Sequence, residues 1–337
     1  MPPARVTVVV PTLAADPRLL DCLASLEAQT EPAVQVVVVD NSGCGAIHRL
    51  GAAKYRFRLI ENRANLGFGA AVNQGFRQFP SPYMAVLNDD AVAHPECFSR
   101  LADALELDPT SGMAAPCITL AGTGLLDSAG MLISRDGSSK QRGHMEPVAR
   151  HDEPGDALLP SGCAALYRRT MLDEIGLFDE DFFLYCEDTD LGLRARWAGW
   201  RCLYVPGARV EHHYSRSAGT ASERKAWYVE RNRLRLAVRC LPLSWLLASP
   251  FASVMRYLWH IVMMFRGQGK AAEFRQAGGG GLKLPWLVVK AHLSLPAALP
   301  GLLRQRAAIR RGARLTSAEF AAVLSRHSIS LRQVAQL

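Results

Sequence analysis

The stretch VTVVVPTLAADPRLLDCLASLEAQTEPAVQVVVVD, Val6–Asp40, contains two short apolar runs separated by a helical pattern. Val6–Val10 and Val34–Val39 are nearly continuous and rich in β-branched residues, as in strands buried on both faces of a parallel sheet. Between them, leucines recur at helical spacing over Pro17–Gln29. The stretch therefore predicts a βαβ unit, in which a helix connects two parallel strands.

The alternation of strand and helix continues along the next part of the chain. The apolar spacing predicts strand, helix, strand, helix and strand in turn at Phe57–Ile60, Phe68–Phe79, Tyr83–Leu87, Pro95–Leu107 and Met113–Thr119. Such alternation is typical of a doubly wound α/β sheet. In these sheets ligands bind at the carboxyl ends of the strands, so we expect the ligand-binding side chains there.

The pattern changes over residues 121–160, which are rich in Gly, Ser, Asp and Pro. This composition predicts hairpins and a mobile loop, and we assign no chemistry to them. Beyond the loop we expect helices at Thr170–Gly176 and Thr189–Trp197. A return strand is expected at Arg201–Val205, ended by Pro206.

The charge of the chain is unevenly distributed. The 337 residues are 49% hydrophobic and 21% charged, a globular composition that argues against large-scale disorder. Residues 1–220 hold 20 basic and 27 acidic side chains, whereas residues 221–337 hold 19 basic and 4 acidic ones. Two regions with different partners are implied.

The cysteines and the N-terminus bear on the cellular compartment. The 8 cysteines are scattered and form no C-x-x-C pair, so we expect reduced, structural thiols. The N-terminal MPPARVTVVVPT lacks a long apolar stretch before a small-residue cleavage site. We therefore expect the protein to lie on the cytosolic side of the membrane.

Acidic residues follow two of the expected strands. Asp40 comes directly after VQVVVV, and Asp89 and Asp90 follow YMAVL within LNDD. Each site should lie at the carboxyl edge of the sheet, on strands that look adjacent. Aspartate and asparagine also favour turns for purely local reasons, which is the structural alternative.

A third acidic site lies in LFDEDFFLYCEDTDLGLRARWAGW, Leu177–Trp200. Glu187 and Asp188 stand where the next helix should begin, and a helix N-terminus favours ionised carboxylates. Helix capping alone does not explain the aromatic run FFLYC before them. Apolar walls would raise a carboxylate pKa toward neutrality, so we favour a catalytic base here.

Two further segments could contribute ligands. His212 and His213 are adjacent on an extended segment, so at most one faces a given site. An imidazole together with the carboxylates of NDD and phosphate oxygens would make an octahedral shell for Mg²⁺ or Mn²⁺. In ENRANLGFGAAVNQG, Asn65 and Asn73 could bond a ligand, but the glycines match only half of a dinucleotide fingerprint. A helix N-terminus with small residues for close packing explains them equally well.

Taken in order, these motifs resemble the family 2 glycosyltransferases of the GT-A fold, and most closely a bacterial rhamnosyltransferase-like branch. The resemblance covers residues 6–217 and is carried by VVVPTL, VVVVDNSG, NRANLGFGAAVNQG, YMAVLNDD, the segment from PSGCAALYRR to WRCLYVP, and VEHHYSRS. It implies an α/β, Rossmann-like, mostly parallel sheet with a C-terminal helical extension. The catalytic unit would occupy 1–220, with a nucleotide-sugar half to about 120 and an acceptor half from about 121.

The resemblance also implies roles for individual residues. Asp188 would be the catalytic base and Glu187 its acidic neighbour, while Asp90 and His212 would bind the metal. The sequence departs from a strict D-x-D motif because Asn88 holds its first position, which leaves the usual ribose contact in doubt. The implied nucleotide-sugar contacts are Pro11, Thr12, Asp40, Asn65, Asn73, Asn88 and Asp89, with Asp40 at the base, and the implied acceptor-side residues are Ser161 and Gly162.

The region 221–337 is basic and apolar in alternating segments. No charge lies between Arg239 and Arg256, but this gap is shorter than the roughly 20 residues that span a bilayer, and it contains two prolines. Apolar helices beside arginine clusters suit an anionic membrane surface. The structural alternative is a helical extension packed on the catalytic unit. Nucleic acid is not expected, because no zinc, RNA-recognition or helix-turn-helix signature occurs.

The sequence thus predicts an inverting, metal-dependent glycosyltransferase peripheral to the inner face of the plasma membrane. Its donor would be dTDP-rhamnose or a UDP-sugar, and its acceptor a polyprenyl-diphosphate-linked glycan or a polysaccharide of the cell envelope. The competing hypothesis is a non-catalytic sugar-nucleotide-binding or scaffold protein at the membrane. A nucleotidyltransferase is disfavoured, because VVVPTLAADPR is not a glycine-rich, basic phosphate loop.

Overall fold

A computed structural model describes residues 4–14, 16–31, 34–213, 223–276 and 283–337. Its centre is a 10-stranded sheet in the order β10-β12-β6-β11-β4-β1-β2-β3, with β5 on β12 and β7 on β6. The strands of this sheet are β1 Val6–Thr12, β2 Val34–Asp40, β3 Arg58–Glu61, β4 Tyr83–Leu87, β5 Ala91–Ala93, β6 Ser111–Leu120, β7 Leu126–Ser128, β10 Gly155–Ala157, β11 Ala164–Arg168 and β12 Arg201–His212.

The valine-rich runs form the middle of this sheet, as the sequence predicts. β1 pairs in parallel with both β2 and β4, and β2 pairs in parallel with β3. Val9, Val37 and Val39 belong to the apolar core on one face, and Val8, Val10 and Val38 to the core on the other. Both faces are buried because alternate side chains of each strand point to opposite sides, which explains the continuous apolar runs.

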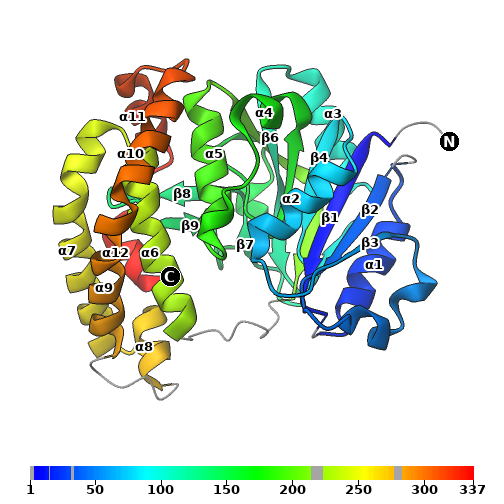
Figure 1. The fold of residues 1–337 in the computed structure, drawn as a ribbon, viewed down its shortest axis with the longest axis horizontal. Coiled ribbons are helices and arrows are strands. Elements are labelled where there is room, and N and C mark those ends of the chain that lie inside the picture. The colour runs from blue at the N-terminus through cyan, green and yellow to red at the C-terminus, as the bar shows by residue number, and fades with distance from the viewer. Residues whose placement is uncertain (1–3, 15, 32–33, 214–222, 277–282) are drawn as a thin grey trace.

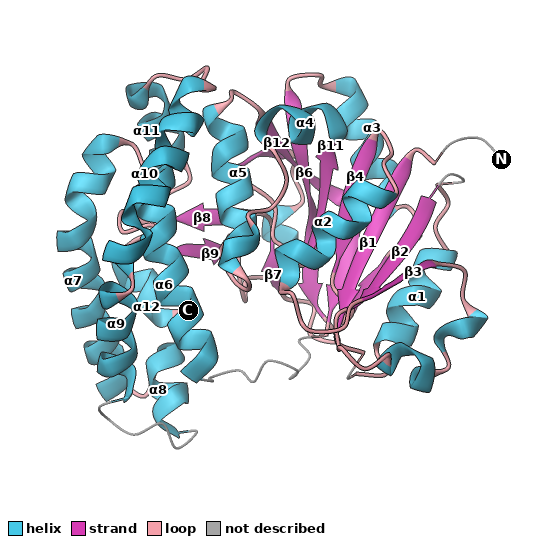
Figure 2. Ribbon diagram, in the orientation of Figure 1, coloured by secondary structure: helices cyan, strands magenta, loops and turns pink. Residues whose placement is uncertain are grey.

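Helices cover both faces of the sheet (Figure 2). α1 Leu19–Glu27 and α3 Cys97–Leu107 contribute apolar residues to one core. α2 Phe68–Gln78, α4 Arg169–Ile175 and α5 Glu187–Trp197 contribute to the other. The expected doubly wound α/β architecture is therefore confirmed. Four short 3-10 helices complete this part, at Ala46–Leu50, Ala52–Lys54, Val148–His151 and Glu180–Phe182.

Two expectations about the strands are wrong. β12 does not end at Pro206 but continues to His212, because an irregular register between Val205 and Arg209 accommodates the proline as a bulge. This continuation carries His212 to the same edge as the LNDD turn. The strands before Asp40 and Asp89 are not neighbours either, since β1 lies between β2 and β4.

The segment 121–160 forms short strands rather than another βαβ unit, as expected. β8 Met131–Ile133 and β9 Ser139–Gln141 make an antiparallel hairpin. β7 adds to the edge of β6, and β10 pairs with β12. All eight cysteines are free in the structure.

The C-terminal part is helical and packs against α5 (Figure 1). Trp197 at the end of α5 stacks on Phe320 at 3.9 Å between ring centroids and donates its Nε1–H to the carbonyl of Cys240. The helices are α6 Glu223–Cys240, α7 Leu243–Phe265, α8 Gly269–Gln276, α9 Lys283–Leu293, α10 Leu295–Arg311, α11 Ser317–Arg326 and α12 Leu331–Gln336. The expected boundary at 220/221 and the end of the VEHHYSRS motif lie outside the described residues.

None of the described helices has by itself both the length and the apolar character needed to cross a bilayer. The bent pair α9 and α10 meets the criterion jointly, on length and composition alone.

Candidate active site

The carboxyl edge of β1, β2 and β4 gathers the first group of candidate residues. Thr12 lies opposite Asp40 in the parallel register, directly after Pro11 opposite Val39. The Thr12 hydroxyl donates a 2.6 Å hydrogen bond to Asp89 Oδ2. Four of the predicted donor-side residues, Pro11, Thr12, Asp40 and Asp89, therefore share one edge, even though β1 separates β2 from β4.

Asp40 and Asp89 differ in electrostatic environment. Burial opposes ionisation of Asp40, but hydrogen bonds from Ser42 and from the Ile47 amide outweigh it and lower the Asp40 pKa. Burial raises the pKa of Asp89 to about 6, with the hydrogen bond from Thr12 opposing the shift and the charge of Asp90 adding to it. The ionised Asp40 thus holds the loop after β2 through its hydrogen bonds. A nearby cation would stabilise the ionised form of Asp89.

The second group is an array of Asp90, His212 and Asp127. Nε2 of His212 lies 3.3 Å from Asp90 Oδ1, and Nδ1 of the same ring lies 2.9 Å from Asp127 Oδ2. Asp90 and Asp127 are 5% and 1% exposed. Burial alone would lower the pKa of His212, but Cys163 and the two carboxylates together raise it well above its ordinary value.

These side chains fit a divalent cation on the Asp90 side of the ring. Adjacent ligand atoms of an octahedral Mg²⁺ or Mn²⁺ site are about 3 Å apart, since each lies about 2.1 Å from the metal. The separation between Asp90 Oδ1 and His212 Nε2 matches this spacing. Asp127 bonds the opposite ring nitrogen and would act as the carboxylate that orients a metal-binding histidine.

Cys163 also lies in this group. Its Sγ, a ring nitrogen of His212 and a carboxylate oxygen of Asp127 are within 4.8 Å of one another. Burial raises the pKa of the Cys163 thiol, which keeps it protonated. Sulfur ligands suit softer cations than Mg²⁺ or Mn²⁺, so we assign Cys163 to packing around the imidazole.

The third group is the acidic pair at the start of α5. Gly162 N–H donates a 2.9 Å bond to Asp188 Oδ2, and Thr189 N–H donates a 2.6 Å bond to Oδ1. Burial raises the pKa of Asp188, and these bonds partly oppose the shift. Burial also raises the pKa of Glu187 to about 8, with the charge of Asp188 adding to it. Glu187 is therefore protonated at neutral pH, which leaves Asp188 as the better base.

The loop before this pair has an unusual backbone. Phe183, Tyr185 and Cys186 have φ values of 63°, 69° and 70°, which are uncommon for residues with a side chain. Asn232 of α6 holds the loop by donating to the carbonyls of Phe182, Leu184 and Tyr185 at 2.7–2.9 Å. α6 thus fixes the backbone that positions Glu187 and Asp188.

The second and third groups meet at the turn before β11. Gly162 bonds Asp188, and the next residue, Cys163, lies beside His212 and accepts a 2.8 Å bond from the Asn88 amide at its carbonyl. Consecutive residues are 3.8 Å apart at Cα, so Asp188 and His212 lie beside neighbouring residues of one dipeptide. Ser161 is buried and accepts a bond from the Cys163 amide, which shapes the same turn.

The two asparagines of the NRANLGFGAAVNQG segment have different environments. Asn65 is exposed, and its Oδ1 accepts bonds from Asn41 and from the Gly67 amide. Asn73 is fully buried and bonds Phe178 and Glu180 through both ends of its amide. Asn73 therefore orders the segment before the acidic pair, and the structure does not bring it to the edge where a donor would bind.

The glycines of that segment serve close packing. Gly67 has a φ of 90°, and a Cβ there would lie 2.4 Å from the carbonyl oxygen of Phe183. That carbonyl accepts a 2.8 Å bond from the Phe68 amide at the start of α2. The packing interpretation explains these glycines, and α2 supports the catalytic loop from the side opposite Asn232.

Sequence reasoning missed Asp127 and Asn232. Asp127 lies in LLDSAG, inside a segment to which we assigned no chemistry, and no local motif marks it. Asn232 stands alone among the arginines of RNRLR, and a single amide in a basic helix is a weak sign of structural bonding. Only the folded chain identifies both.

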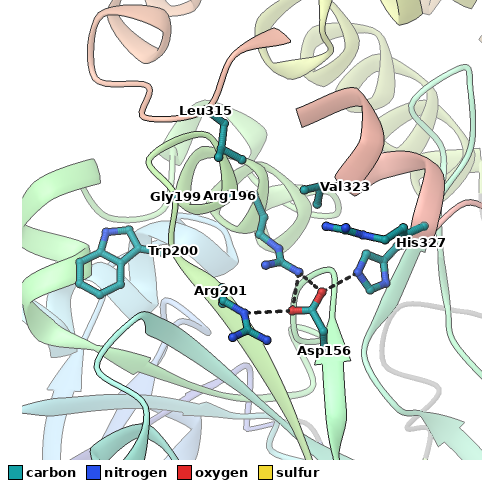
Figure 3. Close-up of a pocket in the computed structure, with 9 residues that line it drawn as sticks. Asp156, Arg196, Gly199, Trp200, Arg201, Leu315, Val323 and His327 are labelled. Atoms are coloured by element: carbon teal, nitrogen blue, oxygen red, sulfur yellow. Dashed lines mark hydrogen bonds and ion pairs between the residues drawn. The ribbon is translucent and has the colours of Figure 1, made fainter. Parts of the chain in front are cut away.

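A separate cavity of about 570 Å³ lies where α5, β10, β12 and α11 meet (Figure 3). Asp156 at its wall pairs with Arg196 and His327, each at 2.9 Å. None of the predicted site residues lines this cavity. This cavity lies between the C-terminal helices and the edge of the sheet, and it is separate from the site described above.

The mostly parallel sheet with helices on both faces is the architecture of the GT-A glycosyltransferases. A profile of the family described as "Glycosyltransferase like family 2" matches residues 2–237, and the chain belongs to this family. The enzyme class predicted from the sequence is therefore confirmed.

Among curated proteins the chain is similar to the N-acetylglucosaminyl-diphospho-decaprenol L-rhamnosyltransferases of two Mycobacterium tuberculosis strains, CDC 1551 / Oshkosh and ATCC 25618 / H37Rv. Identity to each is 33% over 236 residues, which cover 63% of this chain and 77% of the relative. The expected rhamnosyltransferase-like branch is thus supported by a relative of that name.

Two solved structures are similar in fold. GalNAc-T7, solved with UDP, GalNAc and Mn²⁺, is 15% identical with a TM-score of 0.53, and the match covers 67% of this chain but only 48% of that chain. The mannosyltransferase PcManGT from Pyrobaculum calidifontis, in complex with GDP-Man and Mn²⁺, is 18% identical with a TM-score of 0.48, over 99% of this chain and 86% of that one. The first of these supports the assignment of the fold.

Proposed function

We propose that this glycosyltransferase transfers rhamnose from dTDP-rhamnose, with inversion, onto a polyprenyl-diphosphate-linked glycan in cell-envelope synthesis. The name of the mycobacterial relatives supports both the sugar and the lipid-linked acceptor. The observation that carries the proposal is the meeting of Asp188 with the Asp90–His212 pair across Gly162–Cys163. We retain a catalytic unit over 1–220 and a basic region over 221–337.

Asp90 and His212 would hold the metal, and Asp127 would orient the imidazole. When bound, Mg²⁺ or Mn²⁺ supplies positive charge to the leaving diphosphate. Asp89 and Thr12 are positioned to contact the donor at the same edge, next to Pro11, Asp40 and Asn88.

Asp188 would accept the proton of the acceptor hydroxyl. Its raised pKa makes it a stronger base than an exposed aspartate, and the Gly162 and Thr189 amides fix its orientation. Ser161 and Gly162 form the turn beside it and would face the acceptor. A base on the face opposite the leaving group gives in-line displacement, which inverts the anomeric centre, as in inverting glycosidases.

Replacing Asp188 by asparagine tests the assignment of the base. Asp188→Asn keeps the size of the side chain but removes its basicity and leaves one acceptor oxygen for the two backbone amides. We expect transfer to fall at least about 1,000-fold while nucleotide binding is retained. Release of nucleoside diphosphate with a lipid-linked acceptor measures the first quantity, and titration with dTDP and Mn²⁺ the second. Wild-type turnover by this variant would show that another group is the base.

A panel of nucleotide sugars, with and without Mg²⁺ or Mn²⁺, tests the donor. We expect dTDP-rhamnose to be the preferred donor and a chelator to abolish its use. Preference for a UDP-sugar would keep the enzyme class and overturn the rhamnose assignment. No donor turnover by wild type with any sugar would favour the non-catalytic binding protein instead.

A further inference from the structure

One face of α6 carries three arginines and a tyrosine. Arg224, Tyr228, Arg231 and Arg235 are spaced by four, three and four residues, so they lie along one side of the helix. This side faces the loop that precedes Glu187 and Asp188. Arg231 donates to the carbonyls of Asp181 and Phe182 at 2.8 and 3.0 Å, and Arg235 reaches the Asp181 carbonyl at 3.4 Å.

The rings on this face hold the arginines in register. Tyr228 stacks on Phe183 of the loop at 5.3 Å between centroids. The Arg224 guanidinium lies 5.5 Å from the Phe183 ring and 5.9 Å from the Tyr228 ring. Arg231 lies 4.9 Å from both Tyr228 and Trp227. The result is a row of cations supported by flat apolar surfaces.

The arginines of this row form no direct ion pair with a carboxylate of the described residues. In the part of the chain that the structure describes, no carboxylate oxygen lies within 4.0 Å of the guanidinium nitrogens of Arg224, Arg231 or Arg235. Two arginines on the buried side of the same helix behave differently, since Arg233 pairs with Glu230 and Arg239 with Asp179. Neighbouring unpaired cations repel one another, and an anion placed between them would relieve that repulsion.

The position of the row indicates which anion it would bind. It lies beside the loop that precedes Glu187 and Asp188, on a helix that runs along α5 (Figure 1). The opposite group at Asp89, Asp90 and His212 is acidic and would need a metal to hold a phosphate. Arginines bind phosphate directly through paired N–H donors, and aromatic faces suit a prenyl chain or a sugar ring.

We propose that the row Arg224, Arg231 and Arg235 of α6, with Tyr228 and Phe183, binds the diphosphate of a prenyl-linked acceptor. This inference rests on the proposed function, because it places the acceptor on the side of Asp188. It separates two phosphate sites by chemistry: the donor diphosphate at the metal-binding edge, and the acceptor diphosphate at a metal-independent arginine row. The proposal changes no step of the reaction. The bond between the sugar and the donor diphosphate still breaks, and a bond between the sugar and the acceptor oxygen still forms.

Binding of farnesyl diphosphate in detergent micelles, measured by calorimetry without metal, tests the row. We compare wild type with Arg224→Gln/Arg235→Gln and with the control Arg304→Gln/Arg311→Gln. The control removes the same charge from α10, outside the row. We expect the first variant to lose about tenfold or more in affinity and the control less than about twofold. Farnesol, which lacks the diphosphate, should bind wild type at least about tenfold more weakly.

Two further measurements distinguish other sources of phosphate. Affinity for dTDP with Mn²⁺ should be unchanged in both variants, and binding to phosphatidylglycerol vesicles should fall equally in both. Selective loss of dTDP binding would reassign the row to the donor, and selective loss of vesicle binding would make it a membrane contact. Either result overturns the proposal, as does equal loss of farnesyl diphosphate in both variants or equal binding of farnesol and farnesyl diphosphate by wild type.

The failure of the proposed function gives a different result. If wild type binds no nucleoside diphosphate, with or without Mn²⁺, the assignment of the donor site is contradicted while farnesyl diphosphate still reports on the arginine row.

Discussion

Asp127 is the residue whose role depends most on a single contact. Its bond to Nδ1 of His212 leaves Nε2 turned toward Asp90, so Asp127 acts as a positioning residue for the proposed metal pair. It also contacts His144, and although burial opposes ionisation, bonds from His144 and His212 lower the pKa of Asp127 to about 2. A carboxylate that stays ionised in this place can orient the imidazole over the working pH range.

Asp127→Asn should weaken Mn²⁺ binding by about 10–100-fold, because the amide orients the imidazole less well. The measurement is a Mn²⁺ titration followed by electron paramagnetic resonance, with no substrate present. Asp156→Asn is a matched control, since Asp156 also bonds a histidine at 2.9 Å but lies at the other cavity. Equal Mn²⁺ affinity in wild type and Asp127→Asn would remove Asp127 from the proposed site.

The raised pKa of Glu187 predicts how the free energy of unfolding depends on pH. Its folded-state pKa of about 8 lies above the ordinary value of 4.5, so the folded protein retains a proton that the unfolded chain releases. The free energy of unfolding therefore falls as pH rises through the window between these two values, and the loss is complete above the folded pKa. Glu187→Gln cannot titrate and should become more stable relative to wild type across that window.

Urea unfolding at a series of values from about pH 5 to about pH 9 checks this prediction. Glu153→Gln, which changes an exposed glutamate, supplies the baseline. A stability difference between wild type and Glu187→Gln that does not change with pH would mean that Glu187 is ionised in the folded protein.

At the scale of elements, α6 and α2 hold the catalytic loop between them. Asn232 bonds three carbonyls of the loop from one side, and the close approach of Gly67 permits the Phe68–Phe183 bond on the other. The loop contains three residues with positive φ that would relax without these contacts. α6 thus supports this loop from the region that follows the expected boundary at 220.

Asn232→Ala should destabilise the protein by about 3 kcal/mol, because buried carbonyls lose their donor. It should also lower kcat for transfer more than it weakens dTDP binding, since the loop places the base and not the donor. Urea unfolding and steady-state kinetics give the two quantities. Phe320→Leu is the control, because it removes the stack on Trp197 and destabilises α11 without touching the loop. If both variants lose kcat in proportion to stability, Asn232 has no specific effect on the base.

At the scale of the whole molecule, the C-terminal helices have one side that the protein does not cover. The exposed apolar residues of α7 recur at intervals of three and four along the helix: Leu247, Phe251, Val254, Leu258, Ile261 and Phe265. α7 lies at the outer edge of the molecule, away from the sheet (Figure 1). A stripe of this kind next to a region rich in arginine supports the proposed contact with an anionic membrane.

Leu247→Asp/Phe251→Asp should reduce binding to phosphatidylglycerol vesicles about tenfold or more, because two side chains that are 72% and 74% exposed become charged. Co-sedimentation at low and high salt measures it. The control is Leu107→Asp on α3, where the leucine is 87% exposed but lies outside the helical region. If Leu247→Asp/Phe251→Asp and Leu107→Asp bind vesicles equally well, the apolar stripe of α7 does not bind the membrane and serves a different contact.

The sequence by itself determined the sheet, the helices that cover it and the identity of the acidic motifs. Each of these follows from a short-range pattern: valine runs for strands, leucine spacing for helices, and carboxylates placed directly after strands. The proposed metal-binding pair and the proposed base also come from the sequence, because the short motifs that contain them follow one another in an order that resembles a known family.

Only the tertiary structure decided how these motifs meet and what supports them. The Asp127–His212 bond joins residues 85 apart in the sequence, and the Asn232 contacts with the loop join residues 47–50 apart. The passage of β12 through Pro206 and the burial of Asn73 were decided in the same way. Contacts of this kind depend on how layers pack, and packing is a property of the whole chain that no local pattern records.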